Sequence, residues 1–257
     1  MNVKDLLSLK NKIALVTGGT GRYGVPIVEG LAEADATVIT TSRDLKKATA
    51  VAEQMQARGL KVFPAQFEQT NHESVMALKA EIQKRFGRLD VFINNAMYWP
   101  MKHYTDPLEA WVESMAMSST GMFDTLREMV NLIEKSGGGT IVNISSMFGV
   151  YAPDFSNYAG TTMDAPPDYS FHKGGLIALN KYLARYLAPK NIRVNSISPG
   201  GIFANHSEPF LSRYISKVPL KRMANRDDIK GVVVFFASAA SSYVTGENLV
   251  MDGGLHT

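Results

Sequence analysis

An apolar run that leads directly into a glycine-rich turn is the feature that most limits how this chain can fold. Residues 12–17 have no helical period, which predicts a buried strand. The turn at residues 18–24 passes into the segment 22–35, whose apolar residues recur at helical spacing. A strand, a turn and a helix N-terminus in this order form an anion site, because unpaired amides and the helix dipole both point at the turn.

The glycine turn could have one of three roles: binding a nucleoside triphosphate, binding a dinucleotide, or only packing the helix against the strand. Gly19 and Gly24 have the spacing of a nucleoside-triphosphate loop, but Val25 and Pro26 occupy the places where that loop needs Lys and Ser or Thr. Triphosphate chemistry is therefore disfavoured. We interpret the turn as a dinucleotide site, and the alternative is a turn that only packs the helix tightly against the strand.

Composition narrows the class of protein. With 257 residues and 45% hydrophobic composition, the chain can form one large core, and we expect a single dinucleotide-binding catalytic domain over residues 1–257. A net charge of +3 with scattered basic residues predicts no nucleic-acid partner. The absence of cysteine and the dispersal of the histidines predict no metal site. No run resembles a signal peptide or a membrane span, so we expect a cytoplasmic protein with no membrane partner.

Strand-like and helix-like segments alternate along the rest of the chain. Further strands are predicted at residues 36–41, 61–65, 89–96, 140–146, 191–198 and 248–251. Helices are predicted at residues 45–58, 72–86, 107–134, 169–187 and 226–240. This order predicts an α/β fold, a Rossmann-type doubly wound parallel sheet of about seven strands with helices on both faces. Two segments fall outside the pattern, an inserted loop at 151–167 and a substrate-side segment at 202–218.

The second strand ends at Ser42-Arg43-Asp44, where dinucleotide folds contact the adenosine ribose. An acidic side chain there accepts a hydrogen bond from a free 2′-hydroxyl, whereas an arginine suits a 2′-phosphate. No acidic residue closes the strand and Arg43 follows it, so we expect NADP(H) to be favoured, with NAD(H) as the alternative. Asp44 is interpreted as the N-cap of the next helix. The competing explanation of Arg43 is an ordinary surface residue.

Three polar side chains stand where strands end or helices begin on one edge of the predicted sheet: Ser146, Tyr169 and Lys173. Tyr169 and Lys173 are four residues apart and therefore share one helix face. A tyrosine pKa is ordinarily about 10, and a neighbouring ammonium, helped by a cationic nicotinamide ring, would lower it towards neutrality. Tyr169 could then exchange protons while Ser146 donates a hydrogen bond to the substrate oxygen.

Tyr158 competes with Tyr169 for this role, because it also follows Ser146 and the fifth predicted strand. The residue four places after Tyr158 is Thr162, which carries no charge, whereas Lys173 follows Tyr169 at the same spacing. We therefore expect Tyr169 to be the catalytic tyrosine. We also expect the loop at 151–167 to form part of the substrate-pocket wall, the alternative being a surface excursion that touches nothing.

Taken together, these motifs resemble the short-chain dehydrogenase/reductase family over nearly the whole chain. The matching segments are the glycine turn from Thr17 to Gly24, Asn94-Asn95-Ala96, Ser145-Ser146, Tyr169-Ser170-Phe171-His172-Lys173, Asn195-Ser196-Ile197-Ser198-Pro199-Gly200 and Asp252-Gly253-Gly254. Each motif alone is weak, but their order and spacing are specific. The resemblance implies an NAD(P)-dependent oxidoreductase that transfers a hydride between the nicotinamide cofactor and a carbonyl or secondary alcohol of a small molecule.

The resemblance also assigns roles to residues. It implies that Tyr169 is the general acid/base, that Ser146 positions the substrate oxygen, and that Lys173 binds the nicotinamide ribose and lowers the tyrosine pKa. Ser118 stands where the family commonly has an asparagine, and we include it as a fourth candidate catalytic residue. The candidate cofactor-binding residues are Gly18, Thr20, Gly21, Arg22, Tyr23, Gly24, Arg43, Glu68, Asn95, Ala96, Tyr169, Lys173, Pro199, Gly200 and Ile202.

Other positions depart from the family pattern. The glycine turn has the spacing of the extended, sugar-nucleotide-modifying branch, whereas the remaining motifs look like the classical branch. Met97 replaces the glycine of the usual Asn-Asn-Ala-Gly and should crowd the cofactor cleft. Ala204 replaces a threonine that often follows the Pro-Gly turn.

Three segments bear on the substrate. Residues 161–167 and 199–203 are similar to members of surface-sugar and flagellin-modification pathways, and residues 7–12 are similar to sugar-acid and polyol dehydrogenases. These similarities favour a polyhydroxylated, sugar-derived substrate over a fatty acyl one. Tyr98 and Trp99 either stack on a sugar ring or pack the cleft mouth. The alternatives are a 3-oxoacyl-type carbonyl reductase and a non-catalytic dinucleotide-binding regulatory protein, which would have a broken Tyr–Lys pair.

Helices 107–134 and 169–187 carry more apolar residues than one core-facing stripe needs. These residues are Met115, Met117, Met122, Phe123, Leu126, Leu176, Leu179, Leu183 and Leu187. Burial against a symmetry mate would resolve the excess, so we expect a homotetramer or a homodimer, as the resemblance also implies.

Overall fold

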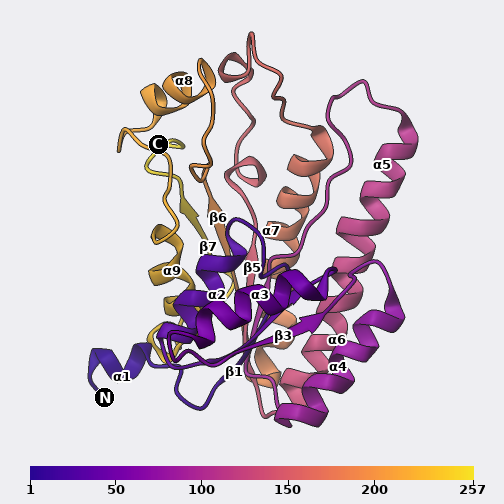
Figure 1. Ribbon diagram of the computed structural model, residues 1–257, viewed down its shortest axis with the longest axis vertical. Coiled ribbons are helices and arrows are strands. Elements are labelled where there is room, and N and C mark those ends of the chain that lie inside the picture. Colours follow the sequence, from indigo (N-terminus) through magenta and orange to yellow (C-terminus); the bar gives the residue numbers. More distant parts are fainter.

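Seven parallel strands form one sheet, in the order β3-β2-β1-β4-β5-β6-β7, in the computed structural model, which describes residues 1–257 (Figure 1). The strands are β1 (Ile13–Val16), β2 (Thr37–Ser42), β3 (Val62–Gln66), β4 (Val91–Asn94), β5 (Gly139–Ile144), β6 (Ile192–Pro199) and β7 (Asn248–Met251). The chain moves outward from β1 to β3 and then returns to β4 on the other side of β1. The carboxyl ends of β1 and β4 therefore flank the switch point at which such sheets bind ligands. The predicted doubly wound α/β fold is confirmed.

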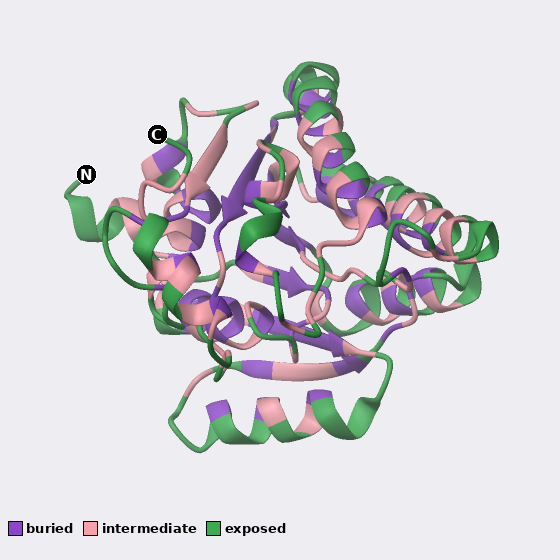
Figure 2. Cartoon of the chain, turned by 90° about the horizontal axis from the view of Figure 1, so that it is seen from above, coloured by how far each residue is buried: buried purple, intermediate pink, exposed green.

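Helices cover both faces of the sheet (Figures 1 and 2). The helices are α1 (Val3–Leu7), α2 (Gly24–Glu33), α3 (Leu45–Gln56), α4 (His72–Phe86), α5 (Leu108–Ser114), α6 (Gly121–Lys135), α7 (Pro167–Leu187), α8 (Phe210–Lys217) and α9 (Asp228–Ala237). Successive residues of β1 supply opposite faces. Val16 joins the apolar cluster formed with α2, α3 and α9, whereas Leu15 joins the cluster formed with α4, α6 and α7. Figure 2 shows the central strands buried between helices whose outer faces are exposed.

The long helical region predicted at 107–134 is confirmed, because residues 108–135 are helical throughout, but it is not one regular α-helix. A π-helical turn at Met115–Thr120 separates α5 from α6. Gly121 follows this turn at a close approach of two chain segments, where a Cβ would lie 2.4 Å from the Gln69 carbonyl oxygen. A π turn adds one residue locally and leaves the apolar period intact on either side, so periodicity alone did not reveal it.

Other helix boundaries differ less from the prediction. α7 begins at Pro167 rather than at Tyr169, because a proline suits the first turn of a helix, where its missing N–H costs no hydrogen bond. α1 was not predicted, and α8 lies inside the segment 202–218. None of the helices is both long enough and apolar enough to cross a membrane.

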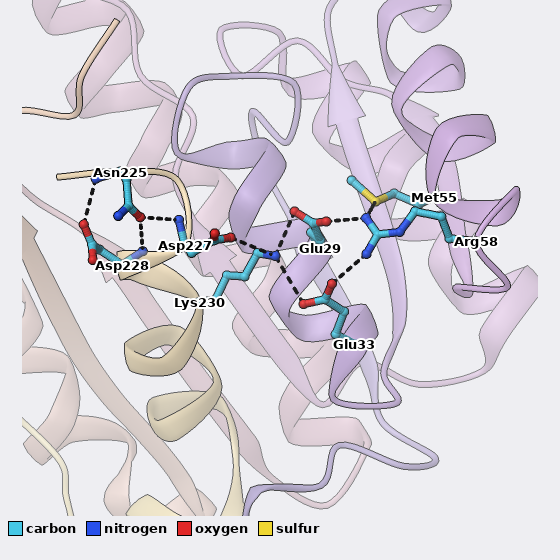
Figure 3. Close-up of polar contacts among 8 residues, drawn as sticks. All are labelled: Glu29, Glu33, Met55, Arg58, Asn225, Asp227, Asp228 and Lys230. Carbon is cyan, nitrogen blue, oxygen red and sulfur yellow. Dashed lines mark hydrogen bonds and ion pairs between the residues drawn. The ribbon is translucent and has the colours of Figure 1, made fainter.

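A network of ion pairs holds α2, which begins at the glycine turn, against α3 and α9 (Figure 3). Lys230 Nζ on α9 lies 3.0 Å from Glu29 Oε2 and 3.2 Å from Glu33 Oε2, both on α2. Arg58, just after α3, pairs with the same two glutamates. The Lys230 stem packs on Gly30, where a Cβ would lie 3.0 Å from the Lys230 Cβ. Because these pairs share partners, they hold three helices together more firmly than isolated surface pairs would.

Candidate active site

A cleft of about 880 Å³ lies at the carboxyl ends of the strands, where the segments that follow β1 to β6 meet the start of α7. Every site residue predicted from the sequence lines this cleft except Ser118. Those residues are Gly18, Thr20, Gly21, Arg22, Tyr23, Gly24, Arg43, Glu68, Asn95, Ala96, Ser146, Tyr169, Lys173, Pro199, Gly200 and Ile202. No group of three or more His, Asp or Glu side chains is placed to hold a metal ion.

The glycine turn is folded tightly at the base of the cleft. Gly18 has a φ of 63°, and a Cβ on Gly24 would lie 2.2 Å from the Gly18 carbonyl oxygen, so neither position accepts a side chain without movement. The Tyr23 phenol donates a hydrogen bond to the Gly200 carbonyl at 2.8 Å and so joins this turn to the segment after β6. A compact turn without side chains at a helix N-terminus fits the pyrophosphate of a dinucleotide.

The segment after β4 is bonded directly to the end of β1. Asn95 Nδ2 donates to the carbonyl oxygens of Thr17 and Gly18 at 2.9 and 3.0 Å. The Thr17 hydroxyl accepts from the amides of Asn95 and Ala96, both at 3.1 Å. The Asn-Asn-Ala motif therefore shapes the middle of the cleft through bonds to backbone. Met97 follows it and also lines the cleft, as expected for a side chain in place of glycine.

Ser146, Tyr169 and Lys173 come together at the end of β5 and the start of α7. Ser145 Oγ donates to the Lys173 carbonyl at 2.8 Å, which fixes α7 against β5. The Lys173 ammonium lies 5.6 Å from the centre of the Tyr169 ring and donates to the Ile144 carbonyl at 2.7 Å. A tyrosine, a serine and a lysine in one buried corner can bind and protonate a carbonyl oxygen.

Burial outweighs the influence of Lys173 on the Tyr169 phenol in the protein without cofactor, whereas the lowered tyrosine pKa was expected with a cationic nicotinamide ring also in place. In the protein alone, burial raises the pKa of Tyr169 above its ordinary value, and the nearby Ser146 hydroxyl opposes this in part. Burial also lowers the pKa of Lys173 to about 7. Lys173 is thus a partial cation at neutral pH and is bonded to a carbonyl, so its effect on the phenol is smaller than the sequence suggested.

Ser118 lies outside the cleft, in the π-helical turn. Its buried hydroxyl donates to the Tyr98 carbonyl and accepts from the Tyr98 amide at 3.2 Å. Both bonds tie the π-helical turn to the segment after β4. The structure therefore gives Ser118 a contact with the backbone that shapes the cleft, and it does not bring the side chain to Tyr169 or Lys173.

The other end of the cleft, after β2 and β3, carries several charges. Arg43 is mostly exposed, lies 3.9 Å from Glu68 Oε2, and sits 5.6 Å from the centre of the Tyr98 ring. Lys47, which the sequence did not single out, also lines this end. Lys47 lies in the first turn of α3, directly after the Asp44 N-cap and therefore close to the end of β2. This position in the sequence was the signal that could have identified Lys47 as a cleft residue.

Sequence reasoning also missed part of the wall around Tyr169. Phe148, Tyr214 and Met223 line the cleft, and Tyr214 Oη accepts a hydrogen bond from the Gly201 amide at 2.8 Å. Tyr158 of the inserted loop lines the cleft as well. Met223 lies beyond every segment assigned to the site, in a stretch with no motif, so only the folded chain reveals it.

Comparison with known proteins gives consistent findings. The sequence matches the family model described as enoyl-(acyl carrier protein) reductase over residues 23–256. It is 33% identical over 255 residues to a 3-oxoacyl-[acyl-carrier-protein] reductase of Aquifex aeolicus, covering 97% of this chain and 99% of that protein. It is 30% identical over 252 residues to post-translational flagellin modification protein A of Campylobacter coli, covering 96% and 98%. A gluconate 5-dehydrogenase from Burkholderia cenocepacia, solved in complex with NADP and tartrate, has a TM-score of 0.89 and 26% identity over 99% of each chain.

Proposed function

This chain belongs to the short-chain dehydrogenase/reductase family and is an NAD(P)-dependent oxidoreductase; on this premise we propose that it interconverts a carbonyl group and a secondary alcohol in a small molecule, with NADP(H) as the favoured cofactor. The observation that carries the proposal is the meeting of Ser146, Tyr169 and Lys173 in one cleft with the glycine turn. Binding of a dinucleotide alone does not require a buried serine, tyrosine and lysine next to the glycine turn.

The chemical roles follow from the hydrogen bonds. The bound nicotinamide supplies or accepts the hydride. Tyr169 donates its proton to the carbonyl oxygen during reduction and takes a proton back during oxidation. Ser146 Oγ accepts from the Phe148 amide at 3.2 Å, which leaves the serine proton free for the substrate oxygen. Lys173, oriented by the Ile144 carbonyl, binds the ribose hydroxyls of the nicotinamide.

Cofactor binding is assigned to three parts of the cleft. The glycine turn holds the pyrophosphate, Asn95 and Ala96 line the middle, and the backbone from Pro199 to Ile202 holds the carboxamide. Arg43, with Glu68 beside it, contacts the adenosine end and favours the 2′-phosphate of NADP(H).

Arg43→Ala tests the cofactor proposal. The variant should lose NADP(H) affinity selectively, by about 1–3 kcal/mol for a charge-assisted contact, with NAD(H) affinity nearly unchanged. Lys84→Ala, an exposed cation on α4, is the matched control. Equal or better use of NAD(H) by the unmodified protein would contradict the preference. Turnover is followed by the absorbance of the reduced cofactor across a panel of carbonyl compounds.

Two substrate types are supported by relatives. Similarity to the gluconate 5-dehydrogenase supports a sugar-derived or polyhydroxylated substrate, and similarity to the 3-oxoacyl reductase supports the acyl alternative. The inserted loop at 151–167 supplies Tyr158 and Met163 to the cleft, and we assign it to the substrate-pocket wall.

Assembly as a homotetramer is part of the proposal, although its basis changes. Four of the predicted interface residues are buried within this one chain and cannot also face a partner: Leu126 of α6 and Leu176, Leu183 and Leu187 of α7. Phe123 of the predicted set is exposed and still supports the assembly, and further large exposed side chains on α5 and α7 join it: Leu108, Val112, Phe171, Tyr182 and Tyr186. Burial of these side chains against a second copy would remove them from water. A monomer in light scattering at micromolar concentration would contradict the assembly.

A further inference from the structure

The half of the cleft beyond Ser146 and Tyr169 is lined mainly by aromatic and thioether side chains, which we call the substrate wall. The substrate wall comprises Trp99, Phe148, Tyr158, Met163, Phe210 and Met223. Trp99 and Phe148 meet the Tyr169 ring edge-on, at centroid distances of 5.0 and 6.4 Å. Tyr158 packs against Phe210 with centroids 5.4 Å apart. These contacts make one largely apolar surface beside the reacting oxygen.

Ionisable groups on this half already have partners or are neutral. Asp164 Oδ2 lies 2.8 Å from His103 Nδ1. Lys173 Nζ is bonded to the Ile144 carbonyl at 2.7 Å, on the side of the cleft assigned to the nicotinamide ribose. Burial lowers the pKa of His206, so its ring is uncharged at neutral pH. None of these groups is free to balance a negative charge on the substrate.

The other cations of the cleft are Arg22, Arg43 and Lys47, which belong to the glycine turn and to the segment after β2; Arg22 is also near enough to His206 to help lower the pKa of that ring. The proposed function assigns that end to the phosphates of the cofactor. A carboxylate held against the substrate wall would lose water and gain no counter-charge, which is strongly unfavourable. The free cations of the cleft thus lie at the cofactor end, whereas the substrate end carries the Asp164 carboxylate, which would repel an anionic substrate.

The phenol of Tyr158 is the polar group of the substrate wall that can both donate and accept a hydrogen bond. Nearby tyrosines are engaged: Tyr23 donates to the Gly200 carbonyl at 2.8 Å, and Tyr151 donates to Asp252 Oδ2 at 3.0 Å. The Tyr158 hydroxyl makes no hydrogen bond within the chain. Burial raises the pKa of Tyr158 to about 12, so the phenol is neutral and can both donate and accept.

From these observations we propose that the substrate is an uncharged, ring-bearing ketone or alcohol, which lies against the aromatic substrate wall and forms a hydrogen bond from a second hydroxyl to Tyr158. Small sugar acids and phosphorylated sugars are excluded by the same wall. The inference rests on the proposed oxidoreductase function and narrows its substrate class. It also separates this protein from its structural neighbour, whose printed substrate, gluconate, is an anion.

The test compares three ketones that share one six-membered ring: cyclohexanone, 4-hydroxycyclohexanone and 4-oxocyclohexanecarboxylate. With NADPH, kcat/KM should be highest for the hydroxyketone and at least about 100-fold lower for the carboxylate, because a buried charge is left unpaired. Equal or better turnover of the carboxylate would overturn the inference.

Calorimetric binding of 1,4-cyclohexanediol and 4-hydroxycyclohexanecarboxylate is measured in parallel. The diol should bind and the acid should not, and the reverse order would overturn the inference whatever the turnover. Absence of turnover with every ketone and either cofactor would instead overturn the proposed function.

Two variants locate the effect on the substrate wall. Tyr158→Phe should raise KM for the hydroxyketone about 10-fold with little change in kcat, and should change KM for cyclohexanone much less, because cyclohexanone has no second hydroxyl. Tyr243→Phe, at a fully exposed tyrosine, is the control and should change neither value. Met163→Lys should improve kcat/KM for the carboxylate by at least about 10-fold by supplying a counter-charge. An unchanged hydroxyketone KM in Tyr158→Phe, or an unchanged carboxylate value in Met163→Lys, would contradict the proposed wall.

Discussion

The two faces of α7 carry matching pairs of polar residues that are bonded very differently. Tyr169 and Lys173 face the cleft, where the lysine has one backbone partner and the phenol has only the Ser146 hydroxyl nearby. Asp168 and His172, each one position earlier, face α5 and the π-helical turn. Asp168 Oδ2 accepts from Ser114 Oγ at 2.6 Å, and Asp168 Oδ1 accepts from the Tyr169 amide at 2.8 Å.

His172 completes the bonds on the second face. Because Ser114 donates its proton to Asp168, it can only accept from His172 Nε2–H, at 2.8 Å. This leaves Nδ1 of the neutral ring as the acceptor from Ser119 Oγ, at 2.9 Å. The chain of bonds spans the π-helical turn and the first turns of α7. One helix therefore has a face whose polar groups are satisfied, which stabilises its position, and a face whose polar groups are incompletely bonded and are free for chemistry.

The largest expected effect is a loss of turnover, caused by a substitution on the α7 face that lines the cleft. Tyr169→Phe removes the proton donor while keeping the ring, so turnover should fall by about 1,000-fold or more. Cofactor binding, measured by fluorescence titration, and the urea midpoint should be nearly unchanged, because the phenol contributes little to packing. If Tyr158→Phe abolished turnover and Tyr169→Phe did not, the assignment of the two tyrosines would be reversed.

On the other face of α7, which packs on α5 and the π-helical turn, a substitution should mainly lower the stability of the protein. Asp168→Ala leaves the buried Ser114 hydroxyl and the Tyr169 amide without an acceptor, which should cost about 2–4 kcal/mol of unfolding free energy. Urea denaturation measures this loss, and Glu53→Ala at an exposed position of α3 is the matched control. A variant as stable as the control would mean that the bonds on this face contribute no net stability.

The pH dependence separates the influence of burial from that of Lys173. Carbonyl reduction needs protonated Tyr169, whose pKa is raised by burial. Reductive kcat/KM should therefore be level through neutral pH and fall only at alkaline pH, by about tenfold per unit once the proton is lost. Alcohol oxidation, which needs the phenolate, should rise over the same alkaline range. A reductive rate that already falls near pH 7 would show that the lysine and cofactor together outweigh burial.

The smallest effect is expected at Ser118, which lies in the π-helical turn next to Ser119, the hydrogen-bond partner of His172. Asparagine in its place can still donate to and accept from the Tyr98 backbone, so Ser118→Asn should leave turnover unchanged or raise it by less than about threefold. Steady-state kinetics measures this directly. A large loss would indicate that the buried pocket accommodates only the shorter side chain.

The sequence predicted the elements that depend on local patterns. The seven strands, the glycine turn and the pairing of Tyr169 with Lys173 follow from periodicity, turn chemistry and helical spacing. The π-helical turn was missed because it leaves apolar periodicity intact on both sides. The network of Asp168, His172 and Ser114 was missed because its members come from α7 and α5, far apart in the sequence.

What the sequence by itself determined is the fold class and the identity of the reacting groups, because strand and helix patterns and the Tyr–Lys spacing are local properties. Only the tertiary structure decided how those groups are charged and what surrounds them. Burial depends on every segment packed around a side chain, and this sets the raised pKa of Tyr169 and the lowered pKa of Lys173. The substrate wall is likewise assembled from segments after β4, β5 and β6, so its uncharged surface exists only once the sheet brings them together.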